Sequence, residues 1–252
     1  MKFNYKKKFD YKTNFKVDKH RQRFINKTIA SGEFYVNREG VLISKEYPKN
    51  EKNNVNNKLY DTKNFRNKKR KYYFDILKLC KKYYKDFINV LEVGAGTGQF
   101  AEMYINKFSP KSYTFYENSN PMVKKIKKRF TVEGPTRISI KKKSFKDLSE
   151  FKLSRYDCVI ALQVFEHINW DKEFLSKISP GTWVFFSVPS VPKSLSDKPS
   201  LAVRLFLTPD SILYRYKSLL DIYEIKEVHR QYHNISFHRY PRKWAIVAQK
   251  KR

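Results

Sequence analysis

The sequence predicts an α/β protein whose core is a doubly wound, mainly parallel β-sheet. From residue 71 onward, short apolar runs alternate with amphipathic helical runs, and this alternation implies right-handed strand-helix-strand crossovers. Three of the seven glycines, Gly94, Gly96 and Gly98, fall within five residues directly after an apolar run. The last two strand-like runs follow one another without a helix between them, which indicates an antiparallel pair at the edge of the sheet.

The first expected element is a short hairpin within residues 33–44. Four of its apolar side chains would face inward: Phe34, Val36, Val41 and Ile43. Apolar residues at three- and four-residue spacing then predict a helix from residue 71 to about 84. It leads into a strand at 89–93, a glycine-rich turn and a helix over 100–108.

The later elements continue the alternation. Apolar runs predict strands at 112–116, 137–140, 157–162 and 182–188. Helical spacing predicts helices at 121–130, 172–178 and 209–220. The final two strands are expected at 222–228 and 243–249, joined by a polar connection.

The charge is concentrated near the start of a 252-residue chain that is long enough for one sizeable core. The formal net charge is +30, and residues 1–90 hold 25 basic and 9 acidic residues, a net of +16. We interpret residues 1–58 as a basic N-terminal extension, a solvated arm with little core of its own, and residues 59–252 as the folded domain. Anionic surroundings would suit this charge. Because 40 of the 54 basic residues are lysine, an A/T-rich genome would explain much of the excess equally well.

Cysteine usage and hydropathy exclude several classes of protein. Cys80 and Cys158 each lie in an apolar run and outside any metal-binding spacing, so we expect neither a disulfide nor structural zinc. No apolar run approaches the roughly 18 residues that span a bilayer, and the first residues lack a secretory h-region. We therefore expect a cytoplasmic protein, although the lysine-rich start leaves a mitochondrial presequence open.

The glycine-rich turn and a later acid together predict a nucleoside cofactor. Glycine lets the backbone approach a ligand closely, where a Cβ would collide. Glu117 ends the next predicted strand, 19 residues beyond Gly98, and the fold brings that strand's carboxyl end beside the turn. A carboxylate there can accept hydrogen bonds from both ribose hydroxyls. Taken alone, the glycines could also form a tight structural turn, and Glu117 could be a capping carboxylate.

The run LEVGAGTG, from Leu91 to Gly98, resembles the first motif of the class I S-adenosylmethionine-dependent methyltransferases. The resemblance covers roughly residues 60–252 and implies a Rossmann-like, seven-stranded sheet whose last strand is antiparallel. It implies that Glu92 supports the glycine loop or the methionine end of S-adenosylmethionine and that Glu117 binds the ribose. The expected cofactor-binding set is Glu92, Gly94, Ala95, Gly96, Gly98, Glu117, Asn118, Ser144, Phe145 and Gln163.

Two further segments bear on the site. Ser144 and Phe145 stand where many relatives place an acid and an apolar residue against adenine, although Phe145 fits the core equally well. Residues 162–168 resemble the "LEHI" segment of methyltransferases that act on small molecules, including the quinone-biosynthesis O-methyltransferases. Relatives with a divalent metal carry another acid at the position of Gln163, so we expect no metal. His167 is the candidate general base, with a capping or Glu166-bridging role as the alternative.

We expect methyl transfer to a hydroxyl of a small or medium acceptor, such as a sugar, a glycolipid precursor or a quinone-like phenol, and an anionic acceptor would suit the charge. The chain contains no DPPY or NPPY signature of base amino methylation. RNA methylation through the basic arm is the first alternative, and a non-catalytic scaffold of a ribonucleoprotein is the second. Candidate RNA contacts are Lys6, Lys7, Lys8, Arg21, Arg23, Lys68, Lys69, Arg70 and Lys71, with Phe3, Tyr5 and Phe9 for base stacking. Further candidate bases are His229, His233 and His238, which a solvated loop explains as well.

Overall fold

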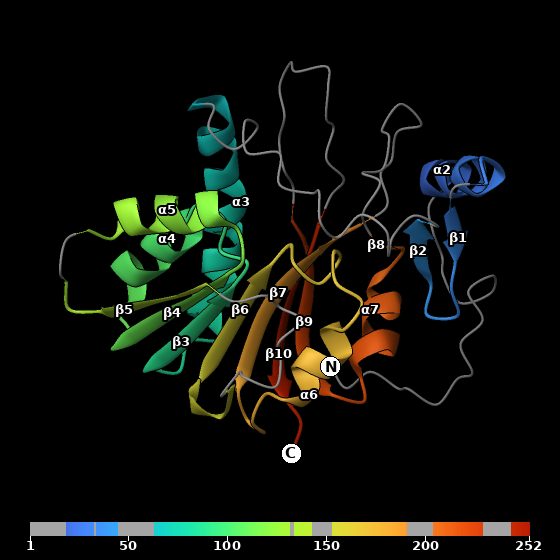
Figure 1. The fold of residues 1–252 in the computed structure, drawn as a ribbon. Coiled ribbons are helices and arrows are strands. Elements are labelled where there is room, and N and C mark those ends of the chain that lie inside the picture. Colours follow the sequence, from blue (N-terminus) through green and yellow to red (C-terminus); the bar gives the residue numbers. More distant parts are fainter. Residues whose placement is uncertain are drawn as a thin grey trace.

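A computed structural model describes residues 19–32, 34–44, 63–131, 134–142, 153–190, 204–228 and 243–252 (Figure 1). Seven strands form the main sheet: β3 (Asn89–Val93), β4 (Ser112–Glu117), β5 (Arg137–Lys142), β6 (Cys158–Leu162), β7 (Trp183–Pro189), β9 (Leu220–Val228) and β10 (Lys243–Lys250). Their order is β5-β4-β3-β6-β7-β10-β9. Strands β3 to β7 pair in parallel, and β10 lies antiparallel to both β7 and β9. The predicted Rossmann-like sheet with an antiparallel last strand is confirmed.

Helices cover both faces of this sheet. Figure 1 shows α3 (Lys63–Lys82), α4 (Gln99–Phe108) and α5 (Asn120–Arg129) on one face, and α6 (Asp171–Ser176) and α7 (Pro209–Tyr216) on the other. Side chains of the central strands alternate between the two cores, as the pleat requires. Val90 and Ile160 belong to the core beneath α3 and α4, whereas Leu91 and Val159 belong to the core beneath α6 and α7.

The ends of several elements differ from the sequence prediction. Helix α3 begins at Lys63, eight residues early, because its first turns are rich in Lys, Arg and Asn and show no apolar spacing. Helix α7 ends at Tyr216 rather than at residue 220, and β9 begins at Leu220, whose partner in β10 is Lys250. Apolar residues continue from helix to strand here, so hydropathy alone cannot place the boundary.

The N-terminal segment forms a second, three-stranded sheet. After helix α2 (Lys19–Ala30), strands β1 (Phe34–Val36) and β2 (Val41–Ser44) make the predicted hairpin. Strand β2 also pairs antiparallel with β8 (Arg204–Phe206), next to α7 in Figure 1. The described part of this segment is therefore not the solvated arm that we expected, because it is folded onto the body of the protein. Residues 45–62 lie outside the described ranges, so the domain boundary at residue 58 stays a prediction.

Strand β2 is buried on both of its faces. Phe34 and Leu42 share one face with Val36 and pack against Phe24, Ile25, Leu205 and Leu207. Val41 on the other face belongs to the main core, with Ile43 packed against it. The expected inward set omitted Leu42, which is fully buried, and included Val36 and Ile43, which are only partly buried. A strand covered on both sides by a helix and a core has no polar face, so alternation fails to describe it.

The described residues also bear on the expectations for disulfides, membrane-spanning helices and metal sites. Cys80 and Cys158 are free and buried. None of the helices described is long and apolar enough to cross a membrane. Among the same residues, no group of three or more His, Cys, Asp or Glu side chains could hold a metal ion.

Candidate cofactor and acceptor site

The glycine loop connects β3 to α4 and depends on left-handed backbone angles. Gly94, Gly96 and Gly98 have φ values of 64°, 58° and 71°, a region that other residues enter at a cost. A Cβ at Gly94 would lie 2.6 Å from Cγ2 of Val164, which is closer than packed atoms approach. A Cβ at Gly96 would meet nothing within 4 Å. The loop therefore packs against the segment after β6 at Gly94 and leaves space at Gly96, as a ligand-binding turn requires.

Glu117, at the end of β4, is hydrogen-bonded to the glycine loop. Its side chain is 5% exposed, and Oε2 accepts from the Gly96 amide at 3.0 Å while Oε1 accepts from the Ser119 amide at 2.9 Å. Burial raises the pKa of Glu117, and the backbone N–H donors act against that shift. Each carboxylate oxygen retains a second lone pair, so this acid can also accept hydrogen bonds from a ribose. Asn118, the next residue, is exposed.

Glu92 and Ala95 lie beneath the α3 and α4 face. The Glu92 carboxylate is buried, and its Oε2 accepts a hydrogen bond of 2.9 Å from the Tyr113 hydroxyl. Burial and this neighbouring carboxylate both raise the pKa of Tyr113. Ala95 belongs to the same core, and its carbonyl accepts from the Gly98 amide at 3.1 Å. The Glu92 side chain is thus held in the core next to the glycine loop. That it supports the loop or the methionine end of the cofactor stays a prediction.

Gln163, directly after β6, has a strained backbone. Its φ is +61°, an angle that costs a non-glycine residue on the order of 1 kcal/mol. Its backbone N–H donates to both the carbonyl oxygen and the Oγ of Ser187, each at 3.1 Å. The Nε2 atom is buried and has no hydrogen-bond partner among the described residues. A buried donor of this kind is costly unless a ligand accepts from it, which fits a cofactor or acceptor beside the glycine loop.

Glu166 and His167 form a buried and exposed pair on the same segment. Glu166 is 2% exposed, whereas the His167 side chain is 40% exposed. The His167 Nε2 lies 3.9 Å from the Glu166 Oε1. Burial raises the pKa of Glu166, and electrostatic interactions with His167, Lys243 and Arg204 act in the opposite direction. Its Oε2 has no hydrogen-bond partner within the described ranges.

Ser187, Tyr72 and Lys243 lie near this segment, because Ser187 accepts from the Gln163 backbone amide and the charge of Lys243 acts on Glu166. The sequence prediction missed Tyr72 and Lys243. Lys243, at the start of β10, is only 3% exposed, and its Nζ lies 5.5 Å from the centroid of the Tyr72 ring. The Tyr72 hydroxyl is hydrogen-bonded to Oγ of Ser187 on β7. A lysine among 40 and a tyrosine among 18 carry no distinguishing signal in this sequence. Only the pairing of β10 with β7 brings Lys243 to the edge where the glycine loop lies.

Other predicted site residues fall outside the described ranges. These are Ser144, Phe145, His229, His233 and His238. Of the candidate RNA contacts, the side chain of Arg23 is described, and it is exposed on α2.

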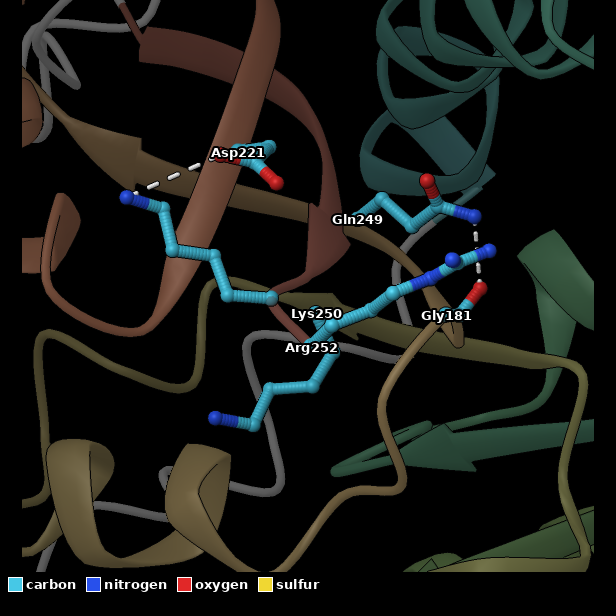
Figure 2. A pocket seen from close by; sticks show the side chains of 6 residues that line it. Gly181, Asp221, Gln249, Lys250 and Arg252 are labelled. Atoms are coloured by element: carbon cyan, nitrogen blue, oxygen red, sulfur yellow. Dashed lines mark hydrogen bonds and ion pairs between the residues drawn. The ribbon is translucent and has the colours of Figure 1, made fainter.

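A shallow pocket of about 410 Å³ lies at the opposite edge of the sheet (Figure 2). Its lining residues are Gly181, Asp221, Gln249, Lys250, Lys251 and Arg252. Figure 2 shows Gln249 reaching the Gly181 carbonyl, a hydrogen bond of 2.7 Å. Gly181 precedes β7, whereas the glycine loop follows β3, so this pocket is separate from the candidate site.

Comparisons with known proteins agree with this fold. Malonyl-[acyl-carrier protein] O-methyltransferase 2 from Ilyobacter polytropus is 26% identical over 108 residues, 41% of this chain and 40% of that protein. The chain thus matches about two fifths of the length of that curated relative. N-methyltransferase NodS from Bradyrhizobium japonicum, solved with S-adenosyl-L-homocysteine, is 12% identical with a TM-score of 0.56, over 82% of this chain and 98% of that chain.

A second structure of similar fold is 1,6-didemethyltoxoflavin-N1-methyltransferase from Burkholderia thailandensis. It is 15% identical with a TM-score of 0.52, over 71% of this chain and 78% of that chain. The family described as "Methyltransferase domain" matches residues 65–234, which include the glycine loop, Glu117 and the 163–168 segment. The chain therefore belongs to this family and is a class I S-adenosylmethionine-dependent methyltransferase.

Proposed function

We propose that this protein transfers the methyl group of S-adenosylmethionine to a hydroxyl of a small or medium acceptor. The observation that carries the acceptor assignment is the Glu166–His167 pair, whose segment packs on the glycine loop through Val164 and Gly94. A half-exposed imidazole backed by a buried carboxylate suits proton removal from a hydroxyl.

The described residues fit the cofactor. Gly96 leaves room for it, Glu117 would accept from its ribose hydroxyls, and Gln163 Nε2 is a buried donor that would bind its polar groups. The sulfonium of S-adenosylmethionine supplies an electrophilic methyl group when bound. The protein's part is then to hold the acceptor oxygen in line with that methyl group and to keep water out.

His167 would take the proton from the acceptor hydroxyl as the new carbon–oxygen bond forms. Glu166, 3.9 Å away, would stabilise the positive charge that the imidazole gains. Tyr72, Ser187 and Lys243 come from α3, β7 and β10 and would line the acceptor side of the site. An acceptor that carries an anionic group would suit the buried Lys243.

The acceptor class can be tested by following the release of S-adenosyl-L-homocysteine. Purified protein is incubated with S-adenosylmethionine and, separately, with phenols, sugars, primary amines and single-stranded RNA, with His167→Ala in parallel. We expect turnover with a hydroxyl compound that His167→Ala slows by about 10²-fold. Turnover confined to amines would refute the hydroxyl assignment. Methylation of RNA that weakens steeply with salt would favour the basic N-terminal segment as an RNA-binding surface. Absence of cofactor binding in the wild type would support the scaffold alternative.

A further inference from the structure

We propose that Arg204 is a positioning residue, which holds the segment of residues 163–168 in the geometry that methyl transfer needs. The inference rests on the proposed function, because this segment carries Gln163, Glu166 and His167. Arg204 itself belongs to β8, outside the main sheet, and lies in none of the motifs that carry the resemblance to the methyltransferases.

Arg204 holds the segment by its backbone. The guanidinium Nη2 donates to the carbonyls of Phe165 and Ile168, and the Arg204 amide donates to the Glu166 carbonyl at 3.2 Å. One residue thus binds three carbonyls within four consecutive positions. The Arg204 side chain is 4% exposed, so water does not compete for these hydrogen bonds. Because the segment has no helix or strand of its own, such contacts decide where its side chains lie.

The charge of Arg204 is balanced by the fully buried Asp171. Its Oδ1 lies 3.1 Å from Arg204 Nη2 and 2.7 Å from Arg215 Nη2. The Tyr216 hydroxyl donates to its Oδ2 at 2.6 Å. Burial alone would raise the pKa of Asp171, but Arg204 and Arg215 hold it below the usual value. The side chain of Arg204, which binds the segment, is therefore held in place by its ion pair with Asp171.

The N-terminal hairpin holds the backbone of Arg204. Ile43 of β2 faces Arg204 of β8 in the antiparallel ladder. Glu39, in the turn of the same hairpin, is paired with Arg215 and with Lys172 at 2.6 Å. The three-stranded sheet is thus connected through Arg204 to the 163–168 segment.

Arg215→Met is a matched control for Arg204→Met. Each change removes a buried arginine that pairs with Asp171, but the hydrogen bonds and ion pairs of Arg215 within the described ranges join it to Asp171 and Glu39, outside residues 163–168. Both variants are expected to melt at a lower temperature than the wild type. Amide exchange in the 163–168 segment, above all at His167, whose amide donates to the Val164 carbonyl at 2.9 Å, separates a positioning role from general destabilisation.

We expect His167 amide exchange to accelerate about tenfold or more in Arg204→Met relative to Arg215→Met, measured under conditions of equal global stability. Arg204→Lys, which keeps one donor nitrogen, should restore part of the exchange protection. If Arg204→Met does not fold, Arg204→Lys compared with Arg215→Lys gives the same test. Equal His167 amide exchange in the two variants would overturn the proposal. Calorimetry with S-adenosyl-L-homocysteine is carried out in parallel on the wild type. If the wild type does not bind it, the proposed function is refuted, whereas the amide-exchange test of Arg204 still holds.

Discussion

Glu117→Gln should weaken both the glycine loop and the cofactor binding that we propose for Glu117. The two carboxylate oxygens of Glu117 accept from the Gly96 and Ser119 amides at 3.0 and 2.9 Å. A glutamine has one oxygen and one NH₂ group, so whichever way the amide turns, an NH₂ faces a backbone N–H. One charge-assisted hydrogen bond is lost and one buried N–H is left without an acceptor. Each effect is worth about 1–3 kcal/mol.

Two measurements check this prediction. The free energy of unfolding in denaturant should fall by about 2–4 kcal/mol, and the Kd for S-adenosyl-L-homocysteine by calorimetry should rise at least about tenfold. Asp221→Asn is the control, because that carboxylate is 60% exposed and pairs only loosely with Lys251 at 3.6 Å. It should change stability by less than about 0.5 kcal/mol. A folded Glu117→Gln protein with wild-type affinity and stability would refute the assigned role of Glu117.

Three further changes test other parts of the structure. His167→Ala should slow turnover by about 10²-fold and leave S-adenosyl-L-homocysteine affinity within about threefold, and unchanged turnover would exclude it as the base. Leu42→Ala should lower the free energy of unfolding by about 2–4 kcal/mol, whereas the exposed Tyr35→Ala should cost less than about 0.5 kcal/mol, so equal small losses would mean that the hairpin does not share the core. The pKa of Asp171 is lower in the folded protein than its unfolded value of 3.8. The ionised carboxylate therefore stabilises the folded state at pH values above 3.8, and this contribution is lost as the pH falls through the folded-state pKa. The stability gap between the wild type and Asp171→Asn, measured by urea unfolding at a series of pH values, should therefore narrow below about pH 4, and a gap independent of pH would contradict the linkage.

Local sequence patterns predicted the sheet and the cofactor loop because their causes are local. The glycines at 94, 96 and 98 are set by backbone angles within one turn, and Glu117 by the length of one strand–helix–strand unit. The pleat likewise places successive residues of β3 and β6 on opposite faces. Each of these features can be recognised within about 30 residues of chain.

The remaining site residues depend on contacts between distant parts of the chain. Arg204 reaches Phe165, 39 residues away, and Arg215 reaches Glu39, 176 residues away. Such contacts leave no periodicity to recognise, and a lysine- and arginine-rich composition hides the three cationic residues that are buried within the described ranges, Arg204, Arg215 and Lys243. The same reasoning explains why the N-terminal segment was interpreted as a solvated arm, although Leu42 and Val41 are among its most buried side chains.

The antiparallel last strand has a consequence for the site. In a parallel sheet only the carboxyl ends of strands meet at the edge that holds the glycine loop. Strands β3, β6 and β7 therefore contribute to this edge their last residues and the residues that come directly after them. Strand β10 runs the other way and delivers its first residue, Lys243, to that same edge, opposite Pro189 of β7. The acceptor site that we propose here would therefore include the first residue of the last strand and would be supported, through Arg204 and β2, by the N-terminal hairpin. The first residue of β10 and, through Arg204, the N-terminal hairpin thus lie near the 163–168 segment, whereas the central strands hold the glycine loop. We therefore expect that acceptor preference can change without disturbing Gly96 or Glu117.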